Sequence, residues 1–298
     1  MVEKNNNPQG FLEAPPRVSE WRRFWRVFLQ RRIVIFGLVI FGLLLISAAF
    51  SELLAPYDPY RGNMEDSLQQ PNGKYWLGTD IQGRDTLTRL IFGSRTALEV
   101  GFITVVASAI VGCTLGMMAG YFGGLTSAII MRIMDAMMGF PMLILALLLA
   151  AVLGGGIQNV IIALSIASIP GNARVMNGLA LTLKENDYVL AERSMGASSL
   201  RIMAGHVLPN ALPPMIVLIT LQLGGIIMAE AGLSFLGIGI KPPGAAWGAM
   251  VNDGYKYLLT NPMLSFAPGI AIMLVVFGFN MVGDGLRDAL DPRLRGIL

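Results

Sequence analysis

The longest uncharged stretch of the chain constrains its fold more than any other feature. From Ala136 to Ala173 there is no Asp, Glu, Lys or Arg, and Gly154, Gly155 and Gly156 interrupt the stretch near its middle. A helix needs about 20 apolar residues to cross a hydrocarbon layer about 30 Å thick. A charge at the helix centre costs about 2.5–3.5 kcal/mol on insertion scales. The stretch therefore predicts two membrane spans joined by a glycine turn.

Four further apolar runs each predict one more span, over residues 33–51, 100–122, about 211–235 and about 262–282. The third span is expected to begin near Ala128, so that Arg132 and Asp135 lie in its first turns, and the fourth to end near Arg174. Only 14% of the residues are charged, whereas soluble domains carry roughly 25%. The predicted fold class is therefore an all-α membrane protein with six transmembrane helices.

The positions of Lys and Arg predict the orientation, because cytoplasmic flanks are enriched in these residues. Five arginines lie within a dozen residues before the first span: Arg22, Arg23, Arg26, Arg31 and Arg32. Six spans place both termini on the same side, so both are predicted to be cytoplasmic. The segment after the first span also holds basic residues, but acidic residues balance them. That segment is predicted to be periplasmic.

The chain is thereby divided into five parts. They are a cytoplasmic N-terminal tail (1–32), the first transmembrane helix (33–51), a periplasmic segment (52–98), a core transmembrane domain (99–285) with a cytoplasmic loop at 178–209, and a cytoplasmic C-terminal tail (286–298). Aromatic residues and arginines alternate from Trp21 to Arg32. Two interpretations of that segment stay open, an amphipathic helix lying on the inner leaflet and a simple topology anchor.

The residue inventory excludes several kinds of chemistry in this chain. There is one cysteine, Cys113, and one histidine, His206, so no disulfide framework or metal-binding cluster is expected. No GxxxxGK[ST] phosphate loop and no HExxH motif occur. With 22 basic and 19 acidic residues the net charge is +3, which does not indicate a nucleic-acid surface. We expect no cofactor, no metal and no catalytic residue.

The connection between the fourth and fifth spans predicts a helix-turn-helix. Asn186 or Asp187 can cap a first helix, Gly196 can end it, and Ser198 or Ser199 can cap a second one. Pro209 is then expected to open the fifth span. The connection also contains six apolar residues that we expect a partner protein to cover: Val189, Leu190, Met195, Leu200, Ile202 and Met203.

This connection resembles the cytoplasmic loop of permease subunits of binding-protein-dependent importers. Their pattern is Glu-Ala-Ala, three residues, Gly, nine residues, Ile, one residue and Leu-Pro. Ala191, Gly196 and Leu208-Pro209 match it, while Leu190, Glu192 and His206 depart from it. Three more stretches, at 77–85, 231–239 and 283–292, are similar to the dipeptide, oligopeptide and nickel branch of that family.

The resemblance implies a type I ABC importer permease fold in a bacterial inner membrane. It also implies a homologous permease partner, two cytoplasmic ATPases that hold ATP and Mg, and an extracytoplasmic solute-binding protein. The loop would couple the chain to an ATPase through residues Ala191, Glu192, Gly196, Ala197, Ser198, Arg201, His206, Leu208 and Pro209. The mechanism implied is alternating access. Dipeptides, longer peptides, glutathione and nickel complexes all remain open as solutes.

A few polar residues have two interpretations each. Arg132 and Asp135 form either an inner gate or a pair that anchors a helix start, and Glu230 either faces the solute path or reaches the outer interface. Asp80 and its neighbours Arg84 and Asp85 form either a capped turn or a contact for the binding protein. Two other functions are weighed as alternatives to an importer permease. A secondary transporter would need coupling groups at mid-bilayer. An intramembrane enzyme would need a nucleophile or a metal cluster within its spans.

Overall fold

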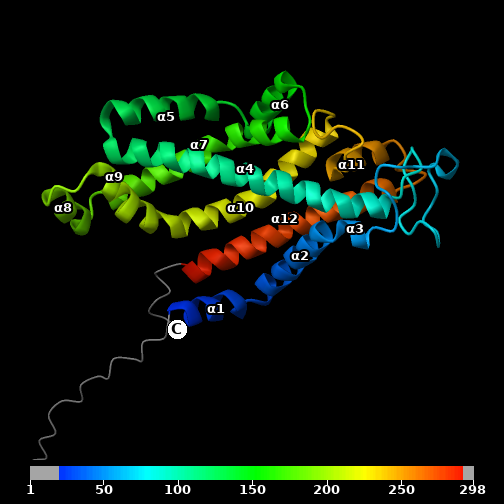
Figure 1. Cartoon of the computed structure of the whole chain (residues 1–298), viewed down its shortest axis with the longest axis horizontal. Coiled ribbons are helices and arrows are strands. Elements are labelled where there is room, and N and C mark those ends of the chain that lie inside the picture. Colours follow the sequence, from blue (N-terminus) through cyan, green and yellow to red (C-terminus); the bar gives the residue numbers. More distant parts are fainter. Residues whose placement is uncertain (1–19, 291–298) are drawn as a thin grey trace, which may run out of the picture.

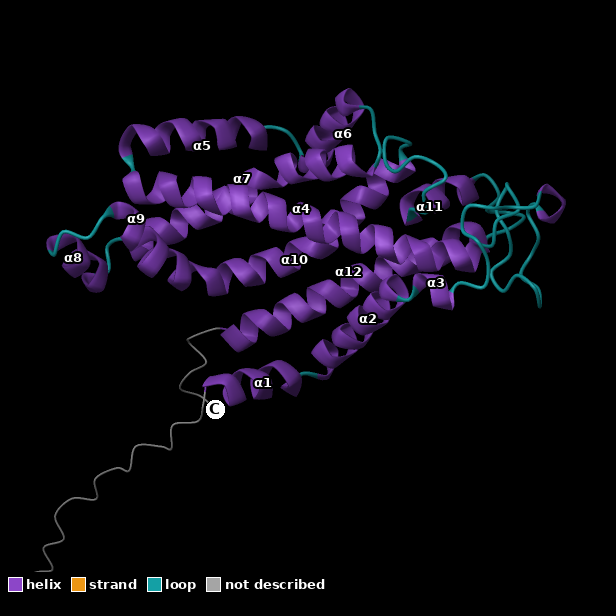
Figure 2. Ribbon diagram, viewed as in Figure 1, coloured by secondary structure: helices purple, strands orange, loops and turns teal. Residues whose placement is uncertain are grey.

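The structure, a computed structural model, describes residues 20–290, in which long helices run side by side (Figure 1). In the described residues the helices are α1 (Glu20–Gln30), α2 (Arg32–Ala49), α3 (Ser51–Leu54), α4 (Thr86–Phe122), α5 (Gly124–Met138), α6 (Met142–Leu153), α7 (Ile157–Leu183), α8 (Asp187–Ser194), α9 (Ser199–Ile202), α10 (Leu208–Phe235), α11 (Trp247–Tyr255) and α12 (Met263–Leu290), with short turns η1 (Met64–Asp66) and η2 (Met203–Val207). Helix α8 lies at one end of the molecule and residues 56–85 lie at the other (Figure 2). We call these the α8 end and the 56–85 end.

Five helices are long and apolar enough to cross a membrane, and the bent pair α5 and α6 makes a sixth if it counts as one span. This agrees with the predicted all-α fold. The sequence predicted a single third helix from near Ala128, but the structure has two, because α5 and α6 meet at 89° and α6 lies crosswise to its neighbours (Figure 1). The break falls at Pro141, which has no N–H and disfavours helical geometry in Phe140 before it.

Two helix limits also differ from the prediction. Helix α4 begins at Thr86, well before Val100, and α7 continues past Arg174 to Leu183. The uncharged runs mark the part of a helix that hydrocarbon can surround, whereas the helix itself continues into more polar surroundings. For the same reason Arg132 and Asp135 lie in the second half of α5 rather than in its first turns.

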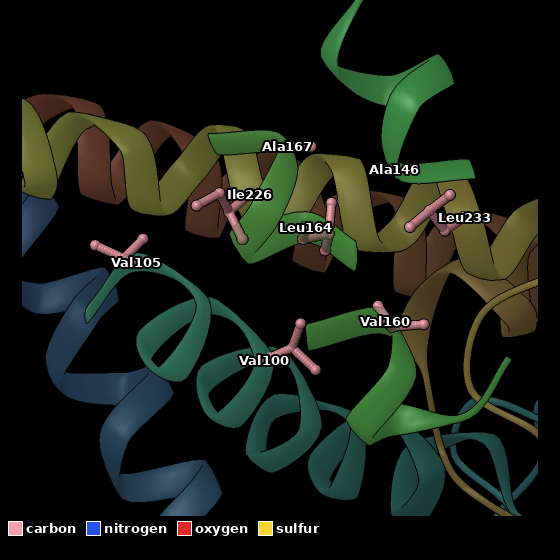
Figure 3. Packing of buried hydrophobic residues seen from close by; sticks show 8 residues of the cluster. All are labelled: Val100, Val105, Ala146, Val160, Leu164, Ala167, Ile226 and Leu233. Atoms are coloured by element: carbon pink, nitrogen blue, oxygen red, sulfur yellow. The ribbon is translucent and has the colours of Figure 1, made fainter. Parts of the chain in front are cut away.

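The core lies where α4, α6, α7 and α10 meet. Figure 3 shows Val100, Val160, Leu164 and Ile226 among the side chains that fill it, and each of them is almost completely enclosed. Helices α4 and α7 approach most closely along the glycines of α4. A Cβ atom on Gly116 would overlap the backbone of Ala173, so only glycine permits this spacing.

Helix α2 packs mainly against α12. A Cβ atom on Gly37 would lie 2.8 Å from the Cβ of Met281 and 2.9 Å from the carbonyl oxygen of Gly278. At the α8 end, Arg31 forms an ion pair with Asp288 at 2.9 Å. The first and last described spans are therefore neighbours.

The 77–85 stretch is a compact turn, as one of the two interpretations predicted. Thr79 and Asp85 form an antiparallel bridge. The Nε of Arg84 donates to Asp80 Oδ2 at 2.7 Å, and the backbone N–H of Thr88 donates to Asp85 Oδ2 at 2.7 Å. Asp85 is thus the N-cap of α4, and the turn sets the direction in which that helix starts.

Asp66 organises the preceding part of the segment. Its Oδ2 accepts hydrogen bonds from the hydroxyl of Tyr75 at 2.9 Å and from the Nζ of Lys74 at 3.1 Å. The Tyr75 hydroxyl, followed by the Lys74 ammonium, lowers the pKa of the Asp66 carboxyl below its usual value. The segment is held together by such polar contacts rather than by an apolar core.

Arg89 joins the 56–85 segment to the chain before α11. Its guanidinium donates to the carbonyl oxygens of Pro59, Pro243 and Gly244 at 3.1, 3.4 and 3.3 Å. It also lies 3.6 Å from a carboxylate oxygen of Asp80. Because this side chain is buried and all these acceptors surround it, the 56–85 end forms one connected unit.

Candidate functional site

The turn between α8 and α9 has the geometry that glycine favours. Gly196 has a φ of +84°. The N–H of Gly196 donates to the carbonyl of Arg193, and the N–H of Ala197 donates to that of Glu192, each at 3.1 Å. This pair of bonds is a Schellman motif, in which a left-handed residue ends the helix. The sequence prediction that Gly196 terminates the first helix is confirmed.

The second helix starts after Ser198, one of the two predicted caps, and then continues into a membrane span. The Oγ of Ser198 accepts from the N–H of Arg201 at 3.4 Å. Helix α9, the π-helical turn η2 and α10 form one apolar helical stretch from Ser199 to Phe235. Pro209 lies in the first turn of α10 but does not separate it from η2. A displacement of α9 therefore acts directly on α10.

The α8–α9 element rests on the ends of α7 and α10. Val189 of α8, Ile202 of α9 and Val207 of η2 are buried, in one cluster with Met176 of α7 and Met215 of α10. This burial corrects part of the sequence prediction. Val189, Ile202 and Met203 are covered by this chain itself, so they are not available to a partner protein.

A second contact joins α8 to the helix that follows. The Nε2 of His206 lies 3.5 Å from Glu192 Oε1, and the rings of His206 and Tyr188 have centroids 5.9 Å apart. Two of the three positions that depart from the family pattern, Glu192 and His206, therefore face each other. They brace α8 against η2.

Three of the six apolar side chains that were predicted to need a partner remain exposed. Leu190 is 43% exposed, Met195 is 75% exposed and Leu200 is 73% exposed. All three belong to α8, α9 and the turn between them, at the tip of the molecule (Figure 1). We call these three residues the tip patch. Ala191 and Ser199 beside it are also exposed.

The other predicted site residues lie elsewhere. Asp135 forms its ion pair with Arg174 of α7 and not with Arg132. Glu230 is only 2% exposed, and its Oε1 accepts a 2.6 Å hydrogen bond from Ser234. Its side chain is therefore enclosed within this chain and does not reach the outer surface. The sequence analysis used Arg174 only to mark the end of a span. A charge within a long apolar helix was nevertheless a signal that this residue has a polar partner.

Comparisons with known proteins bear directly on this arrangement. A family model described as "Binding-protein-dependent transport system inner membrane component" matches residues 112–296, more than half of the chain. The chain belongs to this family. A second model, "N-terminal TM domain of oligopeptide transport permease C", matches residues 19–71. The protein is thus a multi-span permease subunit of an ABC importer, in the dipeptide and oligopeptide branch.

Curated relatives match nearly the whole permease. The dipeptide transport system permease protein of Alkalihalophilus pseudofirmus is 40% identical over 278 residues, which cover 93% of this chain and 91% of the relative. The glutathione transport system permease protein of Pectobacterium atrosepticum is 41% identical, covering 93% and 92%. That of Escherichia coli O157:H7 is 39% identical, covering 97% of each.

A solved structure of a methionine ABC transporter in an inward-facing conformation resembles this permease with a TM-score of 0.56. It is 20% identical and covers 69% of this chain and 97% of its own. At that identity the likeness concerns the fold alone, and it is the type I ABC importer permease fold that was predicted. Family membership implies ATPase and solute-binding partners in general.

Proposed function

We propose that this permease pairs with a homologous permease and imports short peptides across the bacterial inner membrane. Two ATPases holding ATP and Mg would bind at the α8 end, and a solute-binding protein would deliver the solute at the 56–85 end. The tip patch carries this proposal. It is an exposed apolar surface on an element that is continuous with the span α10, which is what an ATPase needs to move a membrane helix.

In this assignment the α8 end is cytoplasmic and the 56–85 end is periplasmic. The arginines around the start of α2 support this orientation. ATP binding would draw the two ATPases together and displace α9, and α10 would carry that displacement into the membrane. The solute path would then open alternately to the two sides. This chain performs no covalent step.

Glutathione is a second candidate solute, because two relatives that match more than nine-tenths of the chain carry that name. Glutathione and dipeptides share amide groups and charged ends. Uptake of glutathione and uptake of a dipeptide, each measured in the reconstituted transporter with its own binding protein, show which of the two solutes is imported.

Leu200→Glu tests the partner assigned to the tip patch. A charge placed at an apolar interface costs several kcal/mol, so we expect the amount of ATPase that copurifies with the permease to fall at least about tenfold. The control is Leu259→Glu, because Leu259 is fully exposed and lies near the opposite end of the chain's helices. Equal ATPase recovery with both variants would contradict the assignment.

Thiol labelling tests the orientation. In a Cys113→Ser background, a cysteine at Ser199 is expected to be shielded from an impermeant reagent in intact cells, while one at Asn72 reacts. Both positions are exposed, so a difference reports the side of the membrane. Cysteines at Asn6 and Gly296, outside the described residues, are expected to behave like the one at Ser199. Reaction at Ser199 from outside would reverse the topology.

A further inference from the structure

Helix α1 is fixed by one of its faces to the end of α12 (Figure 1). Phe28 is buried, and a Cβ atom on Gly285 of α12 would lie 3.2 Å from its ring. Directly after α1, Arg31 pairs with Asp288 of α12. Asp284 is the first charge after the apolar part of α12, so these contacts lie just beyond the residues that hydrocarbon can surround. Helix α1 is therefore at the level of the lipid headgroups.

A second face of α1 is apolar and exposed. Trp21, Trp25 and Leu29 follow one another at four-residue spacing, so they share one stripe of the helix. All three are exposed, Trp21 to 67%. The rings of Trp21 and Trp25 touch edge to face with centroids 5.7 Å apart and form one continuous surface. Tryptophan is enriched at membrane–water interfaces, where its ring lies at headgroup depth.

The neighbouring stripe of α1 carries positive charge. Arg22 and Arg26 are exposed and also lie four residues apart. Neither forms an ion pair with the residues that the structure describes. Like charges at this spacing destabilise a helix, and an anion between the two guanidinium groups would remove that repulsion. Arginine binds phosphate oxygens through paired hydrogen bonds, so a phosphate suits this stripe.

The start of α2 indicates what lies against these two stripes. Only Arg31 separates α1 from α2, which is apolar and long enough to cross a membrane. In its first turns Ile33 and Phe36 are about half exposed. The exposed face of α1 thus adjoins the exposed apolar start of a membrane span. A row of indoles beside a row of arginines matches the boundary between acyl chains and anionic headgroups.

We propose that α1 is a binding site for an anionic phospholipid of the leaflet at the α8 end. The lipid phosphate lies between Arg22 and Arg26, and the acyl chains contact Trp21 and Trp25. Of the two interpretations of this segment, α1 is therefore the interfacial helix and not only a topology anchor. Because α1 packs on α12, the bound lipid also holds it against the last span. The inference goes beyond the proposed function, since it requires neither a peptide solute nor an ATPase.

The test places a fluorophore on α1 and a quencher on the lipid. Leu29→Cys in a Cys113→Ser background supplies the single labelled cysteine of the complete transporter, which is reconstituted in phosphatidylcholine nanodiscs. The nanodiscs contain equal small fractions of either nitroxide-labelled phosphatidylglycerol or nitroxide-labelled phosphatidylcholine. Each basic side chain near an anionic lipid surface strengthens binding about fivefold. We therefore expect the phosphatidylglycerol quencher to act at a concentration at least about fivefold lower than the phosphatidylcholine quencher.

A double variant, Arg22→Gln with Arg26→Gln, is expected to remove this preference, so that both lipids quench equally. The matched control is Arg61→Gln with Lys256→Gln. It removes the same two charges at the 56–85 end, where both side chains are exposed, and is expected to keep the preference. A preference that survives in the Arg22 and Arg26 variant would overturn the headgroup site.

The parent transporter keeps the test decisive should the double variant fail to assemble. Weak quenching by both lipids would mean that a protein surface covers α1. Strong but equal quenching would mean that α1 meets the bilayer without a headgroup site. Either result contradicts the proposal, whereas a preference for phosphatidylglycerol that added salt reduces supports it.

Discussion

Replacing Gly196 by valine is expected to reduce solute uptake at least about tenfold while the permease still inserts at normal levels. Gly196 has a φ of +84°, and a left-handed residue with a side chain costs about 1–2 kcal/mol, more when it is β-branched. No atom lies within 4 Å of the position of its Cβ, so the strain is confined to the backbone. The turn would rearrange and misdirect α9, because the bonds of Gly196 and Ala197 to α8 depend on this geometry.

The measurement is uptake and solute-stimulated ATP hydrolysis by the reconstituted complex. Gly196→Asn is the matched control, because asparagine tolerates the left-handed conformation, and it is expected to retain most of the transport. Normal transport by Gly196→Val would remove the coupling role from this turn. Loss of transport in both variants would mean that the side chain, and not the backbone, is what matters there.

Gly116→Val is expected to lower the yield of monodisperse permease at least about fivefold. A Cβ atom there would overlap the backbone of Ala173. Overpacking of this kind costs about 1–3 kcal/mol when neighbours can relax, and here the neighbour is helix backbone, which cannot turn away. Helices α4 and α7 would have to separate along their whole contact, which includes Gly112 and Gly120.

Gly178→Val serves as the matched control, since a Cβ atom at Gly178 meets nothing within 4 Å. It introduces the same residue into α7, with the same small cost of a β-branched residue in a helix. Size-exclusion profiles and the thermal midpoint of the purified permease compare the two variants. Similar profiles for both would show that the α4–α7 spacing is adjustable.

The sequence predicted the spans because hydrocarbon excludes charge, but it predicted helix ends less well. Helix α4 starts at Thr86, and the real signal for that start was Asp85, a capping residue followed by a helical stretch that still contains charges. The bend at Pro141 was also readable from proline chemistry. It was missed because an uncharged run was treated as a continuous helix.

The local part of the coupling element was predictable for a different reason. Gly196 acts through backbone hydrogen bonds and Ser198 through its hydroxyl, both to residues within five positions, and such bonds follow from residue type. Partners far apart in the chain did not follow. Asp135 was paired with Arg132 by helical spacing, whereas its partner is Arg174, which depends on how α5 packs against α7.

The pairing of α2 with α12 has a consequence for how the chain is made. Helix α2 is the first described span to leave the ribosome, yet the nearest neighbours of Gly37, which are Met281, Gly278 and Val282, all belong to the last one. Until α12 has been inserted, the face of α2 that carries Gly37 meets lipid or a chaperone. A chain truncated before residue 263 would hold α2 in the membrane without α12. The uncovered face of α2 would then distinguish an unfinished subunit from a complete one for the cell's quality-control machinery.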